Sequence, residues 1–205
     1  MSCLPSMMKR YLPLLLFFML CSFDVYAQDL GLVNFNEERL HIQRVGMLTL
    51  GGWALGNMAV NGALLANPSS NEQGHFYRMN IFWNVVNLGL AVPGYLGVMG
   101  TDPASLSLVE SAQEFHRMNK ILLVNVGLDV AYITGGFLLK EMAKTRPNKE
   151  DMFRGYGRSL LLQGGFLLAF DIALVALLET KSPQLNQLLE VVSFGGTSVA
   201  LTFRF

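Results

Sequence analysis

The chain has 205 residues, of which 52% are hydrophobic and only 15% are charged, and its formal net charge is zero. Soluble domains usually carry about 25% charged residues, so this chain has little polar surface to offer water. A neutral chain with a pI near 6.8 also lacks the basic character of a nucleic-acid-binding protein. The composition favours a membrane protein and excludes a nucleic-acid partner.

The first 27 residues have the pattern of a secretory signal peptide. Lys9 and Arg10 precede a short apolar stretch at residues 11–21. Val25 and Ala27 then supply small residues at positions −3 and −1 of a cleavage site after Ala27. The apolar stretch is too short to span a membrane by itself. We therefore predict that residues 1–27 direct export and are removed.

Four long apolar stretches follow, each close to the ~20 residues that a helix needs to cross ~30 Å of hydrocarbon. They are residues 44–66, 79–99, 121–139 and 159–178. A soluble bundle would need a polar outer face on every helix, whereas these stretches are apolar nearly all round. The sequence predicts an all-α membrane protein with a four-helix transmembrane bundle at residues 28–181.

Capping residues and prolines predict where these helices begin and bend. Asn34 with Glu37 resembles a capping box before the first helix, and Asp102 followed by Pro103 suits the start of the third. Pro93 lies inside the second stretch and should kink it, because proline cannot donate a backbone hydrogen bond.

The tail at residues 182–205 has a different pattern. A short helix is predicted from Ser182, and strict alternation at residues 197–205 predicts a strand-like end. Alternation that ends on a terminal Phe resembles the last strand of bacterial outer-membrane barrels. The rest of the chain lacks the repeated alternating segments of a barrel, which excludes that fold.

The charges of the loops predict the orientation in the membrane. Export places the mature N-terminus outside, so residues 67–78 and 140–158 should lie inside. The second of these loops carries the densest positive cluster of the mature chain: Lys140, Lys144, Arg146, Lys149, Arg154 and Arg158. Positive loops favour the cytoplasmic side. We predict the inner membrane of a bacterium, with the outer membrane as a minor alternative.

Amides and carboxylates recur at helical spacing within all four apolar stretches. The sets are Asn57 and Asn61; Asn80, Asn84 and Asn87; Asn125, Asp129 and Tyr132; and Gln163 and Asp171. Spacings of four and seven place residues on one helical face, so we expect these polar stripes to face one another. Counting from the centre of each span puts Asn57, Asn87, Asp129 and Asp171 near the midplane, in one shared polar layer.

Two interpretations of this polar layer compete. In the first, the groups join helices through hydrogen bonds worth about 0.6 kcal/mol each, and Gly52 and Gly56 allow close packing. In the second, Asp129 and Asp171 bind a proton or a cation, because no Lys or Arg lies at their depth. If the two carboxyl groups meet, they could share one proton. The candidate ligands for such an ion are Asp129, Asp171, Asn57, Asn87 and Asn125.

Catalysis finds little support in the sequence. On the predicted threading, His75 lies inside whereas His41 and His116 lie outside, so the three histidines cannot converge on one metal. Phosphate-binding, dinucleotide-binding and nucleophile-elbow motifs are missing. We expect no enzyme activity, no metal and no cofactor.

The layout of leader, four apolar helices and aromatic-ended tail resembles the small exported four-helix membrane proteins of bacteria that have no assigned function. That resemblance implies a membrane location and no particular activity. The sequence thus predicts a structural or interaction-type bundle whose partners are the lipid bilayer and either further copies of itself or an envelope protein. The alternative is a small proton- or cation-coupled transporter or channel subunit that uses the midplane aspartates.

Overall fold

The protein is all-α in the computed structural model, which describes the backbone of residues 6–195 and the side chains of residues 30–190. Its helices are α1 (Ser6–Leu65), α2 (Asn71–Met99), α3 (Leu108–Ala143), α4 (Glu150–Glu179) and α5 (Ser182–Gly195), with short 3-10 helices at Pro103–Ser105 (η1) and Pro147–Lys149 (η2). No strand occurs within residues 6–195. The helical prediction is confirmed, and the strand-like tail at residues 197–205 lies outside the described part.

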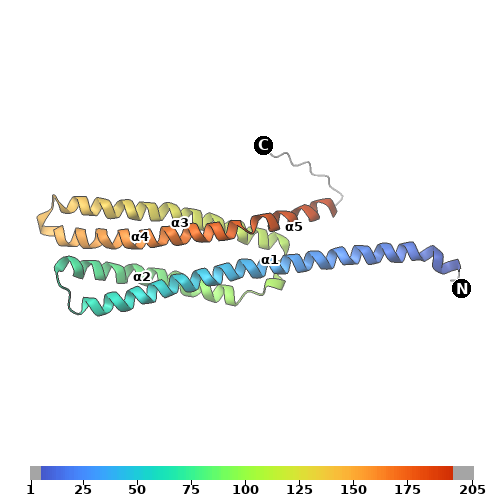
Figure 1. The fold of residues 1–205 in the computed structure, drawn as a ribbon, viewed down its shortest axis with the longest axis horizontal. Helices are drawn as coiled ribbons and strands as arrows, with labels where there is room; N and C mark the ends of the chain where they lie inside the picture. Colours follow the sequence, from blue (N-terminus) through green and yellow to red (C-terminus); the bar gives the residue numbers. More distant parts are fainter. Residues whose placement is uncertain (1–5, 196–205) are drawn as a thin grey trace.

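Two antiparallel helical hairpins form the bundle (Figure 1). Helix α1 packs along α2, helix α3 packs along α4, and the hairpins join mainly through α2 and α4. The resulting order across the bundle is α1, α2, α4, α3. We call the end that holds the α1–α2 and α3–α4 turns the turn end, and the opposite end, where α5 begins, the far end.

Helix starts agree only in part with the sequence. Helix α1 runs without a break through Asn34, so the capping box predicted there is wrong. Asp102 does accept a hydrogen bond from a backbone N–H, but it caps η1. Helix α3 itself begins at Leu108, where Ser107 and Glu110 form a reciprocal capping box. Helix α2 continues through Pro93 to Met99.

Close helix contacts occur at glycines other than those predicted. A Cβ on Gly155 of α4 would lie 2.5 Å from the carbonyl oxygen of Glu72 in α2. Gly136 of α3 and Gly157 of α4 approach each other equally closely, since a Cβ on Gly157 would lie 2.7 Å from the Gly136 oxygen. Nothing lies within 4 Å of a Cβ built on Gly52 or Gly56, so the small-residue pair predicted to pack there does not.

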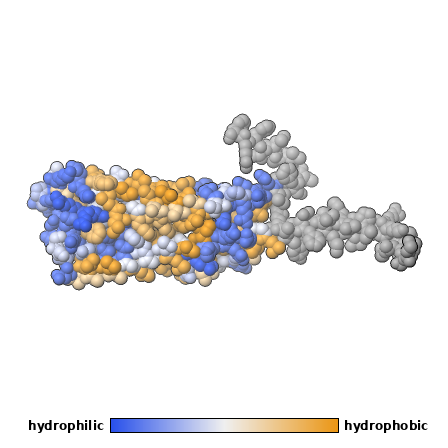
Figure 2. All heavy atoms as spheres, viewed as in Figure 1, coloured by the Kyte–Doolittle hydropathy of each residue, from blue (hydrophilic) through white to orange (hydrophobic). Residues whose placement is uncertain are grey.

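The middle of the bundle is apolar outside and polar inside. Exposed large side chains form an apolar belt between two hydrophilic ends (Figure 2). The belt includes Leu48, Leu55, Phe82, Leu90, Leu123, Val130, Phe137, Leu162 and Ile172. The side chains buried at the same level are mainly polar: Asn61, Asn80, Asn84, Asn87, Asp129, Ser159, Gln163 and Asp171.

Three helices are long and apolar enough to cross a membrane, among the described residues. They are Asn71–Met99, Leu108–Ala143 and the combined stretch Pro147–Glu190. The first predicted span, at residues 44–66, is not among them, because Asn57, Asn61 and several glycines dilute its hydropathy. The four-helix bundle is therefore confirmed, and three of its helices are long and apolar enough to cross a membrane.

Among the described residues, a hydrophobic core cluster lies toward the far end and extends into the level of the belt. Its buried members are Phe35, Phe115, Leu122, Leu174, Leu178, Leu185 and Leu188, from α1, α3, α4 and α5. The ring of Phe35 packs against that of Phe115 with centroids 5.9 Å apart. An ion pair between Lys181 and Glu38 closes the same junction. This cluster holds α5 and the middle of α1 against the second hairpin.

Candidate functional site

Asn80 of α2 is the centre of a hydrogen-bond network that joins three helices. Its Oδ1 accepts from Gln163 Nε2 at 2.8 Å and from Ser159 Oγ at 3.0 Å, both on α4. Its own Nδ2 donates to Asn61 Oδ1 of α1 at 3.3 Å. All four side chains are at most 5% exposed. Buried amides that find such partners hold helices together in a surrounding without water.

The network continues through Trp53 on α1. Its indole Nε1 donates to Gln163 Oε1 at 3.0 Å, and its ring stacks on Phe166 with centroids 3.8 Å apart. Two of the predicted stripe residues bond along their own helix: Asn57 Nδ2 donates to the Trp53 carbonyl and Asn61 Nδ2 to the Asn57 carbonyl. These bonds occupy the two amide nitrogens within α1, so that Trp53 provides the hydrogen bond from α1 to α4.

Asn84 and Asn87, which follow Asn80 along α2, are also linked by side-chain hydrogen bonds. Asn84 Nδ2 donates to the Asn80 carbonyl at 2.7 Å, and Asn87 Nδ2 donates to Asn84 Oδ1 at 3.5 Å. Asn84 and Asn87 are 0% and 3% exposed. The three asparagines therefore form a continuous polar line on the inner face of α2.

Asp129 of α3 and Asp171 of α4 meet inside the bundle. Their carboxyl groups lie within hydrogen-bonding reach of each other, and the side chain of Asn125 lies within reach of Asp171. Both aspartates are buried, at 2% and 4% exposure. Asp129 Oδ2 is buried and accepts no hydrogen bond from any described residue. Two carboxylates that are in contact repel each other unless a proton or a cation lies between them.

The five residues predicted as candidate ligands divide into two groups. Asp129, Asp171 and Asn125 come together between α3 and α4. Asn57 and Asn87 belong instead to the amide network around Asn80. No hydrogen bond between described side chains joins the two groups, so the single polar layer expected from the sequence is two separate clusters.

Sequence reasoning missed some members of these clusters. Ser159 and Trp53 each lie four residues before a recognised polar residue, Gln163 and Asn57, so helical spacing does place them on the same faces. Apart from this spacing, nothing in the sequence indicates that Ser159 belongs to the hydrogen-bond network. Tyr132, predicted on the stripe of Asp129, packs against Trp83 of α2 with ring centroids 4.7 Å apart.

A further polar cluster lies at the far end around Arg39, which the sequence did not single out. Arg39 is only 2% exposed, and burial lowers the pKa of its guanidinium, an effect that the nearby Glu114 carboxylate opposes. One turn earlier, Asn36 Nδ2 donates to the Pro103 carbonyl at 3.1 Å. These contacts attach α1 to the segment that leads into α3.

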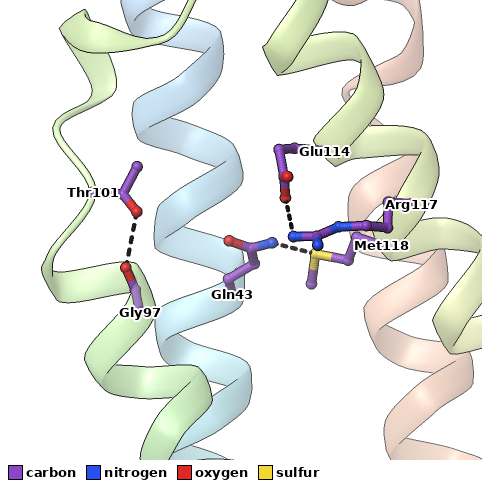
Figure 3. Close-up of polar contacts among 6 residues, drawn as sticks. All are labelled: Gln43, Gly97, Thr101, Glu114, Arg117 and Met118. Atoms are coloured by element: carbon purple, nitrogen blue, oxygen red, sulfur yellow. Dashed lines mark hydrogen bonds and ion pairs between the residues drawn. The ribbon is translucent and has the colours of Figure 1, made fainter.

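Figure 3 shows the polar contacts just inside this end of the bundle. Gln43 of α1 points across to α3 and its Nε2 contacts Met118 Sδ at 2.6 Å. Beside it, Arg117 and Glu114 form an ion pair along α3 at 2.5 Å. Residues 30–190 contain no group of three or more metal-binding side chains.

Comparison with known proteins gives one match. The model of a family of unknown function (DUF6992) matches residues 49–172. No curated protein and no solved structure matches the chain. The matched region contains the amide network and the carboxyl pair, whereas Arg39 and α5 lie outside it.

Proposed function

The chain belongs to the DUF6992 family of unknown function, and we propose that it is an integral membrane protein whose bundle has a structural or interaction role. The observation that carries this proposal is the apolar belt around a polar interior (Figure 2). Contiguous apolar surface of this extent is avoided in soluble monomers. Lipid chains cover such a belt without cost, and the buried amides then find their partners in one another.

Charge at the two ends supports a defined orientation. The turn end, at residues 66–79 and 140–158, carries seven Lys or Arg against four Asp or Glu. The far end, at residues 30–44, 100–120 and 179–190, carries five against seven. The positive-inside rule places the turn end in the cytoplasm. With the leader-like N-terminus, this favours the inner membrane of a bacterium and an outside N-terminus.

The amide network supports a structural role. Each of its hydrogen bonds lies between groups of neighbouring helices or turns, and none of the four side chains around Asn80 has spare exposure for a ligand. A network of this kind fixes the arrangement of helices and gives the bundle a constant outer surface. Such a surface suits contact with another membrane protein or with a second copy of the chain.

Two measurements on the full chain test insertion and orientation. Alkaline carbonate should leave the protein in the membrane pellet; release into the supernatant would overturn the proposal. The natural cysteines are Cys3 and Cys21, so single cysteines can be introduced in a variant that lacks both. Asn148→Cys at the turn end should resist an impermeant maleimide in intact cells, whereas Ala104→Cys at the far end should react. The reverse labelling would overturn the orientation.

A second candidate function is proton- or cation-coupled transport, and the contact between Asp129 and Asp171 favours it. Ionisable groups inside a membrane bundle commonly mark ion pathways. Neither helix offers a cation near the pair, since α3 has no Lys or Arg between Lys120 and Lys140 and α4 has none after Arg158. A shared proton or a bound monovalent cation would neutralise the two carboxyl groups, and Asn125 would hold Asp171 in place.

Flux into liposomes tests this second candidate. The purified protein would be followed for proton and monovalent-cation movement, together with Asp129→Asn, Asp171→Asn and the control Asp102→Asn at the exposed cap of η1. Transport predicts flux that both interior variants lose and the control keeps. No flux from correctly inserted protein would reject transport and leave the structural role.

A further inference from the structure

A groove at the turn end combines an apolar wall with a positively charged one. It encloses about 710 Å³ between α3 and α4. Phe137 and Leu138, 60% and 59% exposed, form the wall nearest the belt. Lys140, Lys144, Arg154 and Arg158 form the wall beyond it. The groove therefore lies where the apolar belt meets the polar end of the molecule.

The cations of this groove exceed its acids. Four Lys or Arg side chains line it against two carboxylates, Glu72 and Glu141. The groove at the far end, of about 610 Å³, has no such excess, because Arg44 and Lys181 face Glu37 and Glu38 there. The turn-end groove therefore keeps one cation in excess after Glu150, which pairs with Arg154, is counted with its acids.

The groove's cations differ in how firmly they are held. Arg158 is fixed across helices, with Nη1 2.8 Å from Glu72 Oε1 and its guanidinium 5.3 Å from the centroid of the Phe76 ring. Lys144 pairs with Glu141 and Arg154 pairs with Glu150, each one turn away on an exposed helix surface. Ion pairs of that kind contribute little and exchange readily. Lys140 has no ion pair with any described side chain.

We propose that this groove binds the headgroup of an anionic phospholipid. The phosphate would lie against Lys140, Lys144 and Arg154, with the acyl chains along Phe137 and Leu138. Basic pockets between membrane helices on the cytoplasmic side recognise lipids by this chemistry. A zwitterionic lipid brings its own ammonium group and would leave the excess positive charge unmatched. The inference rests on the proposed insertion in a membrane.

Native mass spectrometry of the purified full chain in detergent tests the site. The protein is titrated with phosphatidylglycerol, with phosphatidylcholine of the same acyl chains, and with inorganic phosphate. We expect phosphatidylglycerol to bind at least fivefold more tightly than phosphatidylcholine. Lys140→Gln with Lys144→Gln should weaken phosphatidylglycerol binding about 25-fold, since each lysine near a lipid surface contributes a factor of about five and the two factors multiply.

The matched control is Arg117→Gln with Lys120→Gln at the far end. It removes the same charge and likewise breaks one ion pair along α3, that of Arg117 with Glu114. It should leave the preference for phosphatidylglycerol unchanged. Equal binding of both lipids, or an equal loss in both double variants, would overturn the site. Displacement of the lipid by equimolar inorganic phosphate would also overturn it, because the ligand would then be a soluble anion.

Failure of this inference is distinguishable from failure of the proposed function. A chain that alkaline carbonate releases from membranes overturns insertion and the lipid site together. A chain that stays in the membrane yet shows no lipid preference overturns the lipid site alone. Circular dichroism of both double variants should match that of the wild type, since the substituted side chains are exposed.

Discussion

A single oxygen, Oδ1 of Asn80, accepts hydrogen bonds from two side chains of α4 while the amide of the same residue donates to α1. Gln163 of α4, 1% exposed, also joins three helices, because it bonds to Trp53 of α1 and to Asn80 of α2. Loss of the Asn80 side chain removes one hydrogen-bond partner each from Ser159, Gln163 and Asn61. Leaving a buried polar group without a hydrogen-bond partner generally costs more free energy than forming the hydrogen bond gains.

Asn80→Leu should therefore lower the free energy of unfolding by about 2 kcal/mol, from three bonds at about 0.6 kcal/mol each. Asn57→Leu is the matched control, because Asn57 is only half-buried and bonds within its own helix. Asn57→Leu should lower the free energy of unfolding clearly less than Asn80→Leu does. Thermal unfolding of both variants in the same detergent measures the difference, and equal losses would contradict a central role for Asn80.

At the scale of helices, the contact between α2 and α4 depends on Gly155. The nearest neighbours of a Cβ at this position are backbone atoms, the Glu72 oxygen at 2.5 Å and the Phe76 nitrogen at 2.9 Å, along with His75 Cβ at 2.8 Å. Backbone atoms within a helix cannot move aside as a flexible side chain can. The two hairpins would have to separate to admit even one methyl group.

Gly155→Ala should thus destabilise the protein by about 1–3 kcal/mol, the usual cost of overpacking. Gly56→Ala is the control, since nothing lies within 4 Å of its Cβ position. Alanine favours a helix over glycine by up to about 1 kcal/mol, so this variant should be neutral or more stable. The two melting temperatures should move in opposite directions or differ clearly. A Gly155→Ala protein as stable as the wild type would show that α2 and α4 do not pack this closely.

Helical periodicity predicted much at this scale, but not which helices become neighbours. The spacing of Asn80, Asn84 and Asn87 correctly placed them on one inward face. The absence of a nearby cation marked Asp129 and Asp171 as candidate ion ligands, but the sequence left open whether the two carboxyl groups meet. Periodicity specifies which face of a helix is buried, whereas the packing of α2 against α4 depends on tertiary contacts that local spacing does not encode. For that reason the single layer expected from the sequence divided into two clusters.

Local signals failed where tertiary packing overrides them. Asn34 and Glu37 have the spacing of a capping box, yet α1 continues past them, since Phe35 and Asn36 are buried against the second hairpin. Gly52 and Gly56 have the spacing of a packing motif, yet they face away from every neighbour. Short motifs of this kind describe what a segment permits, and the surrounding helices decide which option is used.

For the whole molecule, two different forces act in two regions. Within the belt the interior is held by hydrogen bonds between polar side chains. At the far end, outside the belt, α5 is held by the apolar cluster that includes Leu185 and Leu188. Burial of apolar side chains is favourable where the unfolded alternative is water.

Leu185→Ala should accordingly cost about 2–5 kcal/mol, as for a buried leucine in a soluble core. Leu185 is 1% exposed, whereas Leu96 is 62% exposed on the belt. Leu96→Ala exchanges one lipid-facing apolar side chain for a smaller one and should change stability little. Unfolding by denaturant in mild detergent compares the two, and a Leu96→Ala loss as large as that of Leu185→Ala would contradict a lipid-facing belt.

The polar interior around Asn80 also has a calorimetric consequence. The large positive heat capacity of unfolding in soluble proteins comes from newly wetted apolar surface, whereas newly wetted polar surface lowers it. Separation of these helices inside a micelle would wet amides and carboxyls and leave the belt in detergent. The heat-capacity increment per residue should therefore be far below the ~12–15 cal/mol/K of a soluble domain.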